Sequence, residues 1–174
     1  MNLQNFSIRQ ATVEDVPLIL QFILELAEYE GLAHEVDATE DLLRENLFGS
    51  KPSAEVVFGC HEGTPVGFAL FFQNFSTFQA KPGIYLEDLY VRPGLRGKGY
   101  GTAMLAFLAK LAVKRNGGRF EWGVLTWNTP AREYYVSIGA KPQERFLLNR
   151  MEGAALETLA ARFPEDAWPF EQPR

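Results

Sequence analysis

Hydrophobic positions recur along the chain with two periods, and each period predicts one type of element. Apolar residues from Val16 to Ala27 repeat at the spacing of one helix face, which predicts a helix that ends near Glu30. Similar patterns and stop signals predict further helices over residues 40–48, 100–116, 129–139 and 154–163. Short apolar runs rich in β-branched and aromatic residues predict strands over residues 6–11, 54–63, 64–74, 84–91, 119–127 and 144–150.

Polar residues beside these runs predict where several elements begin. Thr12 followed three residues later by Asp15 has the spacing of a capping box, and Thr39 has the N-cap position of the second helix. The sequence "EGT" at residues 62–64 predicts the tight turn of a hairpin. Thr129–Pro130 has the order of a cap followed by proline, which predicts the start of a helix.

The order of these elements predicts a layered α/β or α+β domain with a mostly antiparallel N-terminal sheet. A chain of 174 residues without repeats or a linker is expected to form one domain, residues 1–174. Its core would cover about residues 6–150. A C-terminal helix and tail would follow at residues 151–174, and the tail from Pro164 is expected to be irregular.

The composition of the chain indicates which partners and which cellular compartment to expect. The formal net charge of −5 argues against nucleic acid as the main partner, because phosphate binding needs a basic face. No apolar run reaches the roughly 18 residues that span a bilayer, and the N-terminus has no apolar signal core. A single cysteine, Cys60, cannot form an internal disulfide, so we expect a cytoplasmic protein without a membrane partner.

Acidic residues concentrate in one segment, residues 25–45. The segment contains Glu25, Glu28, Glu30, Glu35, Asp37, Glu40, Asp41 and Glu45, against Arg44 alone. One interpretation is a pair of solvated helix faces, which is the usual reason for a charge run. The other is a negative field that attracts a cationic substrate.

A glycine-rich loop follows the strand at residues 84–91. Gly97, Gly99 and Gly101 alternate with Lys98 and Tyr100, and a helix begins here. Bare backbone at a helix N-terminus favours an anion, although glycines also serve in flexible turns. The spacing fits neither the Gly-x-x-x-x-Gly-Lys-Ser/Thr loop of nucleotide triphosphatases nor a dinucleotide-binding fingerprint.

Two adjacent carboxylates, Glu87 and Asp88, interrupt the same strand. Strict alternation predicts that Glu87 shares a face with Leu89, while Asp88 shares the other face with Leu86 and Tyr90. A buried carboxylate costs several kcal/mol unless it is paired or hydrogen-bonded. One acid could pair with a structural cation, but two beside an anion loop favour a functional site.

These motifs resemble a known family. The stretch "VRPGLRGKGYGTAML" resembles motif A of the GNAT superfamily of N-acetyltransferases, and "LTWNTPAREYYVSIGAKP" resembles its motif B. "ELAEYE", "YLEDLYV" and "WNTPAREYYVSIGA" are similar to the diamine acetyltransferase group, which includes spermidine/spermine and thialysine N-acetyltransferases. The resemblance implies the GNAT fold, a central mixed and mostly antiparallel sheet with helices on both faces, and acetyl-CoA as co-substrate.

The resemblance also implies roles for individual residues. Glu87 of the "LED" motif would be the general base, Tyr135 would be the general acid, and Asp88 would bind substrate or hold the strand end. Tyr29 and Glu30 would contact the amine. The cofactor would lie against Leu89, Tyr90, Val91, Arg96, Gly97, Lys98, Gly99, Tyr100, Gly101, Thr102, Asn128 and Tyr135. A homodimer is expected from the resemblance alone.

The implied reaction is acetyl transfer to a primary amine of a small cationic molecule, either a thialysine-like amino acid or a diamine. Departures at Phe75–Phe78 and at Arg145–Phe146 from the polyamine branch favour the thialysine branch. Alternatives are a protein, peptide or aminoglycoside-like acceptor, or an acyl-CoA-binding protein without catalysis. His34 and His61 have no metal or triad spacing and are expected to be ordinary polar or strand-end residues, and no metal is expected.

Overall fold

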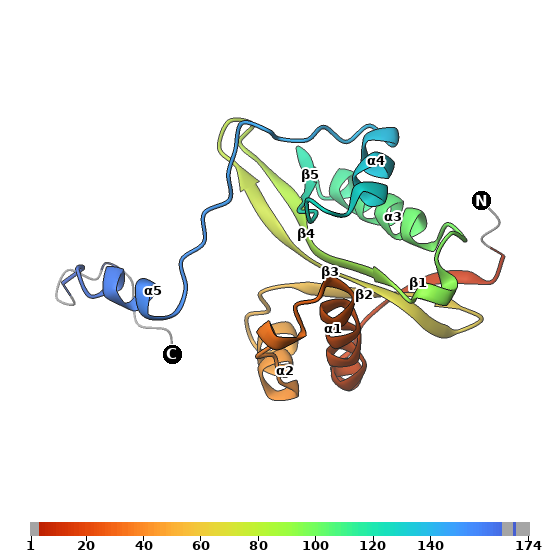
Figure 1. Cartoon of the computed structure of the whole chain (residues 1–174), viewed down its shortest axis with the longest axis horizontal. Coiled ribbons are helices and arrows are strands. Elements are labelled where there is room, and N and C mark those ends of the chain that lie inside the picture. Colours follow the sequence, from red (N-terminus) through yellow and green to blue (C-terminus); the bar gives the residue numbers. More distant parts are fainter. Residues whose placement is uncertain (1–3, 165–168, 170–174) are drawn as a thin grey trace. The chain divides into compact units, whose positions relative to one another are not determined.

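The computed structural model describes residues 4–164 and residue 169 (Figure 1). Residues up to Leu125 form one compact unit, and residues from Thr126 onward form a second. A single domain over residues 1–174 stays a prediction. Residues 165–168 and 170–174 of the tail that was expected to be irregular lie outside the described residues.

The first unit is built on a five-stranded sheet in the order β1-β2-β3-β4-β5. The strands are β1 (Phe6–Gln10), β2 (Glu55–His61), β3 (Thr64–Ser76), β4 (Lys81–Val91) and β5 (Arg119–Trp122). Neighbours pair antiparallel, except that β4 and β5 are parallel. This confirms the mixed, mostly antiparallel sheet.

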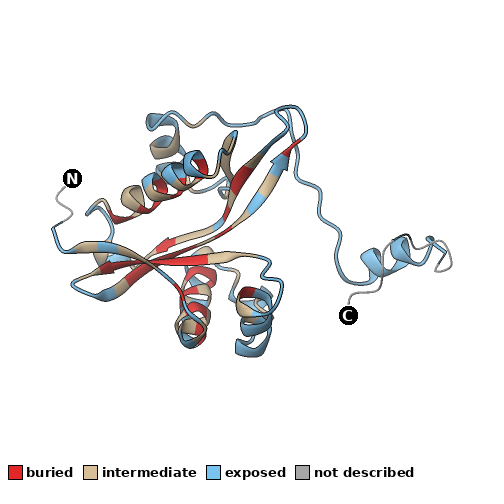
Figure 2. Cartoon of the chain, turned by 180° about the vertical axis from the view of Figure 1, so that it is seen from behind, coloured by how far each residue is buried: buried red, intermediate tan, exposed pale blue. Residues whose placement is uncertain are grey.

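Helices cover both faces of this sheet, as predicted. α1 (Val16–Glu30) and α2 (Glu40–Phe48) lie on one face, and α3 (Tyr100–Lys114) lies on the other (Figure 1). Buried residues gather on the central strands and on the helix sides that face them (Figure 2). Phe22 of α1 packs against Phe58 and Phe68, with ring centroids 5.9 and 5.4 Å apart, so this side of α1 is the core face. Of the apolar stripe predicted for this helix, Val16, Ile19 and Ala27 are buried, whereas Leu24 is exposed.

The structure confirms three local predictions: the capping box at Thr12, the N-cap at Thr39 and the hairpin turn at residues 62–64. The Thr12 amide donates to the Asp15 carboxylate at 2.8 Å, which completes the capping box before α1. The Thr39 hydroxyl oxygen accepts from the Leu42 amide at 3.3 Å and caps α2. Glu62 and Gly63 both have positive φ, 50° and 78°, as a two-residue hairpin turn requires.

The second unit contains α4 (Thr129–Ser137) and α5 (Gly153–Ala160). The predicted strand at residues 144–150 is wrong: this segment forms no strand, and Phe146, Leu147 and Leu148 are exposed. A β-prone run becomes a strand only where a neighbouring strand accepts its hydrogen bonds, and none is paired with it among the described residues. The strand predicted over 119–127 also ends earlier, at Trp122.

Candidate active site

A bulge in β4 sets the positions of the two adjacent carboxylates. Asp88 pairs with Leu70 of β3, whereas Leu86 pairs with the next residue, Phe71, so Glu87 has no residue opposite it. Neighbouring residues of β3 face opposite sides of the sheet. The prediction that Asp88 shares a face with Leu86 is therefore wrong, because a bulge interrupts the alternation at this point.

Two other carboxylates, those of Glu87 and Glu30, lie near enough to Asp88 for their charges to act on it. Glu87 is exposed, and Asp88 is partly buried beside it. Burial, and after it the charges of Glu87 and of Glu30 at the end of α1, together raise the pKa of Asp88 to about 7. Burial also raises the pKa of Glu30. Among the described residues the Asp88 carboxylate has neither a hydrogen bond nor an ion pair, so no structural cation compensates it.

The acidic residues at positions 25–45 do not all have the same environment: some lie on a solvated face, and one lies near the carboxylates at the bulge. Glu25 has a structural partner, because Arg92 donates to its two oxygens at 2.9 and 3.0 Å and this hydrogen bonding lowers the pKa of Glu25. Glu28 and Glu35 are exposed, as a solvated face requires. Glu30 belongs to the carboxylate cluster at the bulge.

β4 loses its parallel neighbour at the same point. Pairing with β5 covers Gly83 to Leu86, opposite Arg119 to Trp122, and does not continue to Glu87. From Glu87 to Val91 this edge of β4 faces no strand among the described residues. Backbone donors and acceptors here can therefore bind an extended ligand, which suits the predicted role of Leu89, Tyr90 and Val91.

The glycine loop places bare backbone before α3. Gly97 and Gly99 have φ of 76° and 88°, a region where a side chain is strained. The Ala103 amide donates to the Gly99 carbonyl at 2.9 Å, so the amides of Tyr100 and Gly101 precede the first bond of the helix. The loop thus has the geometry that an anion needs at a helix N-terminus.

Two aromatic contacts position this loop. The Tyr100 ring is buried and stacks on Phe6 of β1, with centroids 4.7 Å apart and planes 6° from parallel. The Arg96 guanidinium lies 4.1 Å from the centre of the Tyr29 ring and donates from Nε to the Val91 carbonyl at 2.8 Å. The structure thereby brings a predicted cofactor residue, Arg96, against a predicted substrate residue, Tyr29.

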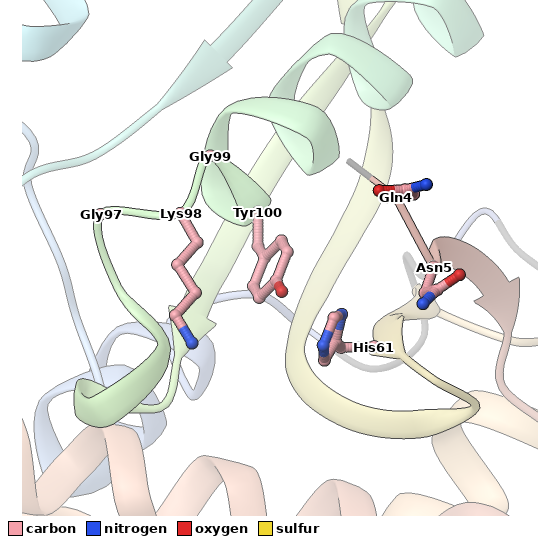
Figure 3. A pocket seen from close by; sticks show the side chains of 7 residues that line it. All are labelled: Gln4, Asn5, His61, Gly97, Lys98, Gly99 and Tyr100. Atoms are coloured by element: carbon pink, nitrogen blue, oxygen red, sulfur yellow. The ribbon is translucent and has the colours of Figure 1, made fainter. Parts of the chain in front are cut away.

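One pocket adjoins the loop and includes residues that the sequence did not single out for a site. Lys98 and Tyr100 line it together with His61, Gln4 and Asn5 (Figure 3). His61 is the last residue of β2, in agreement with its predicted strand-end position. No motif or spacing pointed to this pocket, because its walls come from segments far apart in the sequence.

The second unit contains the motif B residues. The Asn128 side-chain oxygen accepts from the Ala131 amide at 3.3 Å, so Asn128 caps α4, and the prediction that the cap is Thr129 is wrong by one residue. The Tyr135 ring lies 5.9 Å from that of Tyr134, and burial raises the pKa of Tyr135. Within its own unit Tyr135 is thus a partly buried phenol, and its role stays a prediction.

Cys60 and His34 lie in surroundings that are ordinary for a core residue and a surface residue. Cys60 is 2% exposed in the core cluster under α1, and burial raises the pKa of its thiol. His34 is exposed and lies 3.8 Å from Glu35. The described part of the chain contains no group of three or more metal-binding side chains. Within the same residues, no helix is both long and apolar enough to cross a membrane.

Residues 20–140, which include the bulge, the glycine loop and α4, match the profile of the acetyltransferase (GNAT) family. The chain belongs to the GNAT acetyltransferase family. It is therefore an N-acetyltransferase that acts on amines, and family membership implies acetyl-CoA as its co-substrate. The open β4 edge and the glycine loop fit such a co-substrate, since they offer backbone groups to an extended arm and a cradle to its phosphates.

Several known proteins match this enzyme over most of their length. A mouse thialysine N-epsilon-acetyltransferase is 36% identical over 89% of this chain and 97% of its own. An L-ornithine N5-acetyltransferase from Arabidopsis thaliana is 32% identical, covering 87% of this chain and 86% of its own. A solved integron cassette protein from V. cholerae has a TM-score of 0.75 at 27% identity, covering 90% and 98%.

Proposed function

We propose that this GNAT enzyme acetylates a primary amine of a small cationic molecule, a thialysine-like amino acid or a diamine. The observation that carries the proposal is the cluster of Glu30, Glu87 and Asp88. Its charges meet at the open edge of β4, and Asp88 has no partner among the described residues. A cationic substrate would supply the missing counter-charge.

Amine chemistry needs a base at this place. An alkyl ammonium with a pKa near 10.4 is neutral in only about one part in 2,500 at pH 7, so the nucleophile must lose a proton. A carboxylate near the thioester attracts the cation and then accepts the proton, directly or through water. Glu87 is exposed at the bulge, which suits contact with an incoming substrate.

The transfer then proceeds by direct attack in a ternary complex. Glu87 takes a proton from the ammonium, and the nitrogen lone pair forms a bond to the carbonyl carbon of the thioester. The carbon–sulfur bond breaks and the nitrogen releases its second proton to solvent, which leaves the neutral amide. The departing thiolate takes a proton from the Tyr135 hydroxyl, which solvent then restores. Asp88, Tyr29 and Glu30 bind the substrate cation in this scheme.

The co-substrate would extend along the first unit from the β4 edge to the glycine loop. Backbone groups of Leu89, Tyr90 and Val91 would hold the thioester and the pantetheine arm. The loop from Arg96 to Thr102 would hold the pyrophosphate, and Asn128 would contribute from motif B. Tyr90 can take part only through its backbone, because its side chain is 5% exposed and packs in the core.

Two relatives support an amino-acid acceptor, since they are named for transfer to thialysine and to the N5 position of ornithine. The test is an acceptor screen that follows release of free thiol from acetyl-CoA, with thialysine, ornithine, lysine, spermidine, short peptides and an aminoglycoside side by side. We expect thialysine or ornithine to give the highest kcat/KM. A preference for peptides or aminoglycosides would refute the acceptor class, and binding of acetyl-CoA without thiol release for any amine would indicate a non-catalytic protein.

We further propose a homodimer, to be tested by size-exclusion chromatography with light scattering. A mass of about twice the 19.6 kDa of the chain would support it. A mass equal to that of one chain over the working concentration range would refute it.

A further inference from the structure

The pocket beside the glycine loop is lined by more than the loop itself. It has a volume of about 610 Å³ and is lined by Gln4 and Asn5 before β1, by His61 at the end of β2, and by loop residues 97–100. Figure 3 shows the Lys98, Tyr100 and His61 side chains around one common space, with Gln4 and Asn5 on its far side. The pocket therefore extends from the predicted pyrophosphate site toward β1 and β2.

His61 has an unmet hydrogen-bonding demand at this wall. Its Nδ1 is buried and has no hydrogen-bond partner among the described residues. Its ring lies 5.5 Å from the Tyr100 ring, which is itself held on Phe6. A buried polar nitrogen without a partner costs free energy. The remainder of the half-buried His61 side chain lines the pocket, so the ring can contact a ligand there.

The rest of the wall favours an anion. The exposed Lys98 side chain reaches into the space from the loop, and Gly97 and Gly99 turn their backbone with positive φ beside the N-terminus of α3. Glu62 is the acidic residue next to His61, and its carboxylate accepts from the Asn5 side chain at 3.3 Å. An ammonium, an amide and a ring nitrogen around one cavity match the donors that a phosphate monoester recruits.

We propose that this pocket binds the nucleotide end of CoA, with Lys98 and His61 holding the phosphate monoester on its ribose. The proposal rests on the acetyl-CoA dependence of the proposed function and goes beyond it, because it assigns His61 and the β1–β2 wall to nucleotide recognition. CoA carries this 3′-phosphate, whereas 3′-dephospho-CoA has the same pyrophosphate, pantetheine and adenine without it. The two ligands therefore separate this pocket from the loop amides.

The experiment is a titration calorimetry comparison of CoA with 3′-dephospho-CoA. We expect the wild-type protein to prefer CoA about tenfold or more, which corresponds to one charge-assisted phosphate contact. His61→Asn should reduce the preference to less than about threefold and leave the Kd for 3′-dephospho-CoA nearly unchanged. Lys98→Ala should also reduce the preference, and because Lys98 belongs to the pyrophosphate loop it should weaken the binding of both ligands. Matched controls are His34→Asn and Lys110→Ala, since both side chains are exposed and lie outside the pocket.

The outcomes separate the two proposals. Equal affinity of the wild-type protein for the two ligands, or a full preference retained in His61→Asn, would overturn the assignment of the pocket. Failure of the folded wild-type protein to bind either ligand would instead count against the proposed function. Lys98 is exposed on a loop, so Lys98→Ala gives a folded variant even if His61→Asn loses stability, and thermal unfolding of each variant checks this.

Discussion

Asp88 lies directly opposite Leu70 across the β3–β4 ladder, and the carboxylate next to it in the chain, Glu87, has no opposite residue at all. This one-residue bulge coincides with the end of the β4–β5 pairing. The strand therefore offers a carboxylate pair and an open backbone edge at the same place. In the proposed function the amine and the thioester meet there, and this would give a reason for two adjacent acids in a strand.

Replacing the predicted base tests the chemistry directly. Glu87→Gln keeps the size of the side chain but removes its ability to accept a proton, so kcat should fall by about 100-fold or more. The Kd for acetyl-CoA should change less than about threefold, as measured by calorimetry. Glu28→Gln, on the exposed face of α1, is the control and should retain wild-type turnover. A wild-type kcat for Glu87→Gln would remove Glu87 from the mechanism.

Removing one hydroxyl tests the predicted acid. Burial raises the pKa of Tyr135, which keeps its phenol protonated and able to donate near neutral pH. Tyr135→Phe should therefore lower kcat by about 10- to 100-fold with little effect on the KM for the amine, in a thiol-release assay. Its neighbour on α4 provides the comparison: if Tyr134→Phe is slowed and Tyr135→Phe is not, the assignment of the acid is wrong.

The elevated pKa of Asp88 predicts a pH-dependent stability. In the folded protein the group titrates at about 7 instead of 3.8, so its favourable contribution is complete below about pH 4 and is lost as the pH rises through 7. Asp88→Asn cannot ionise, and at pH 8 its free energy of unfolding should exceed that of the wild type by about 1–3 kcal/mol more than at pH 4. Urea denaturation at both pH values measures this. A difference between the two proteins that does not change with pH would show that Asp88 ionises normally.

The glycine loop allows a comparison within a few residues. Gly99 has a φ of 88° and caps α3, so Gly99→Ala should weaken acetyl-CoA binding by about tenfold and destabilise the fold by about 1 kcal/mol. Gly94 lies in the preceding turn without a positive φ, and a Cβ there would meet no atom within 4 Å. Gly94→Ala should therefore bind acetyl-CoA as the wild type does. Equal Kd values for both variants would contradict the role of the loop.

Much of this protein could be predicted from its sequence because the relevant signals are local. Periodicity placed the five strands and the five α-helices of the described residues, and the caps at Thr12 and Thr39 depend only on residues three positions apart. The alternating glycines likewise predicted bare backbone at the start of a helix, and the structure adds that Gly97 and Gly99 have positive φ. The strand predicted at residues 144–150 was wrong although the segment has a β-prone composition, because no neighbouring strand pairs with it among the described residues.

Only the tertiary structure decided how the carboxylates are arranged. The bulge at Glu87 is a property of the register between β3 and β4, which a local period cannot report, and the approach of Glu30 to Asp88 depends on how α1 packs on the sheet. The pocket at His61 arises in the same way, from β1, β2 and the loop meeting in space. The sequence by itself determined most of the elements, the glycine-rich loop and the family, because these follow from neighbours in the chain. Long-range pairing determined which side chains share one site.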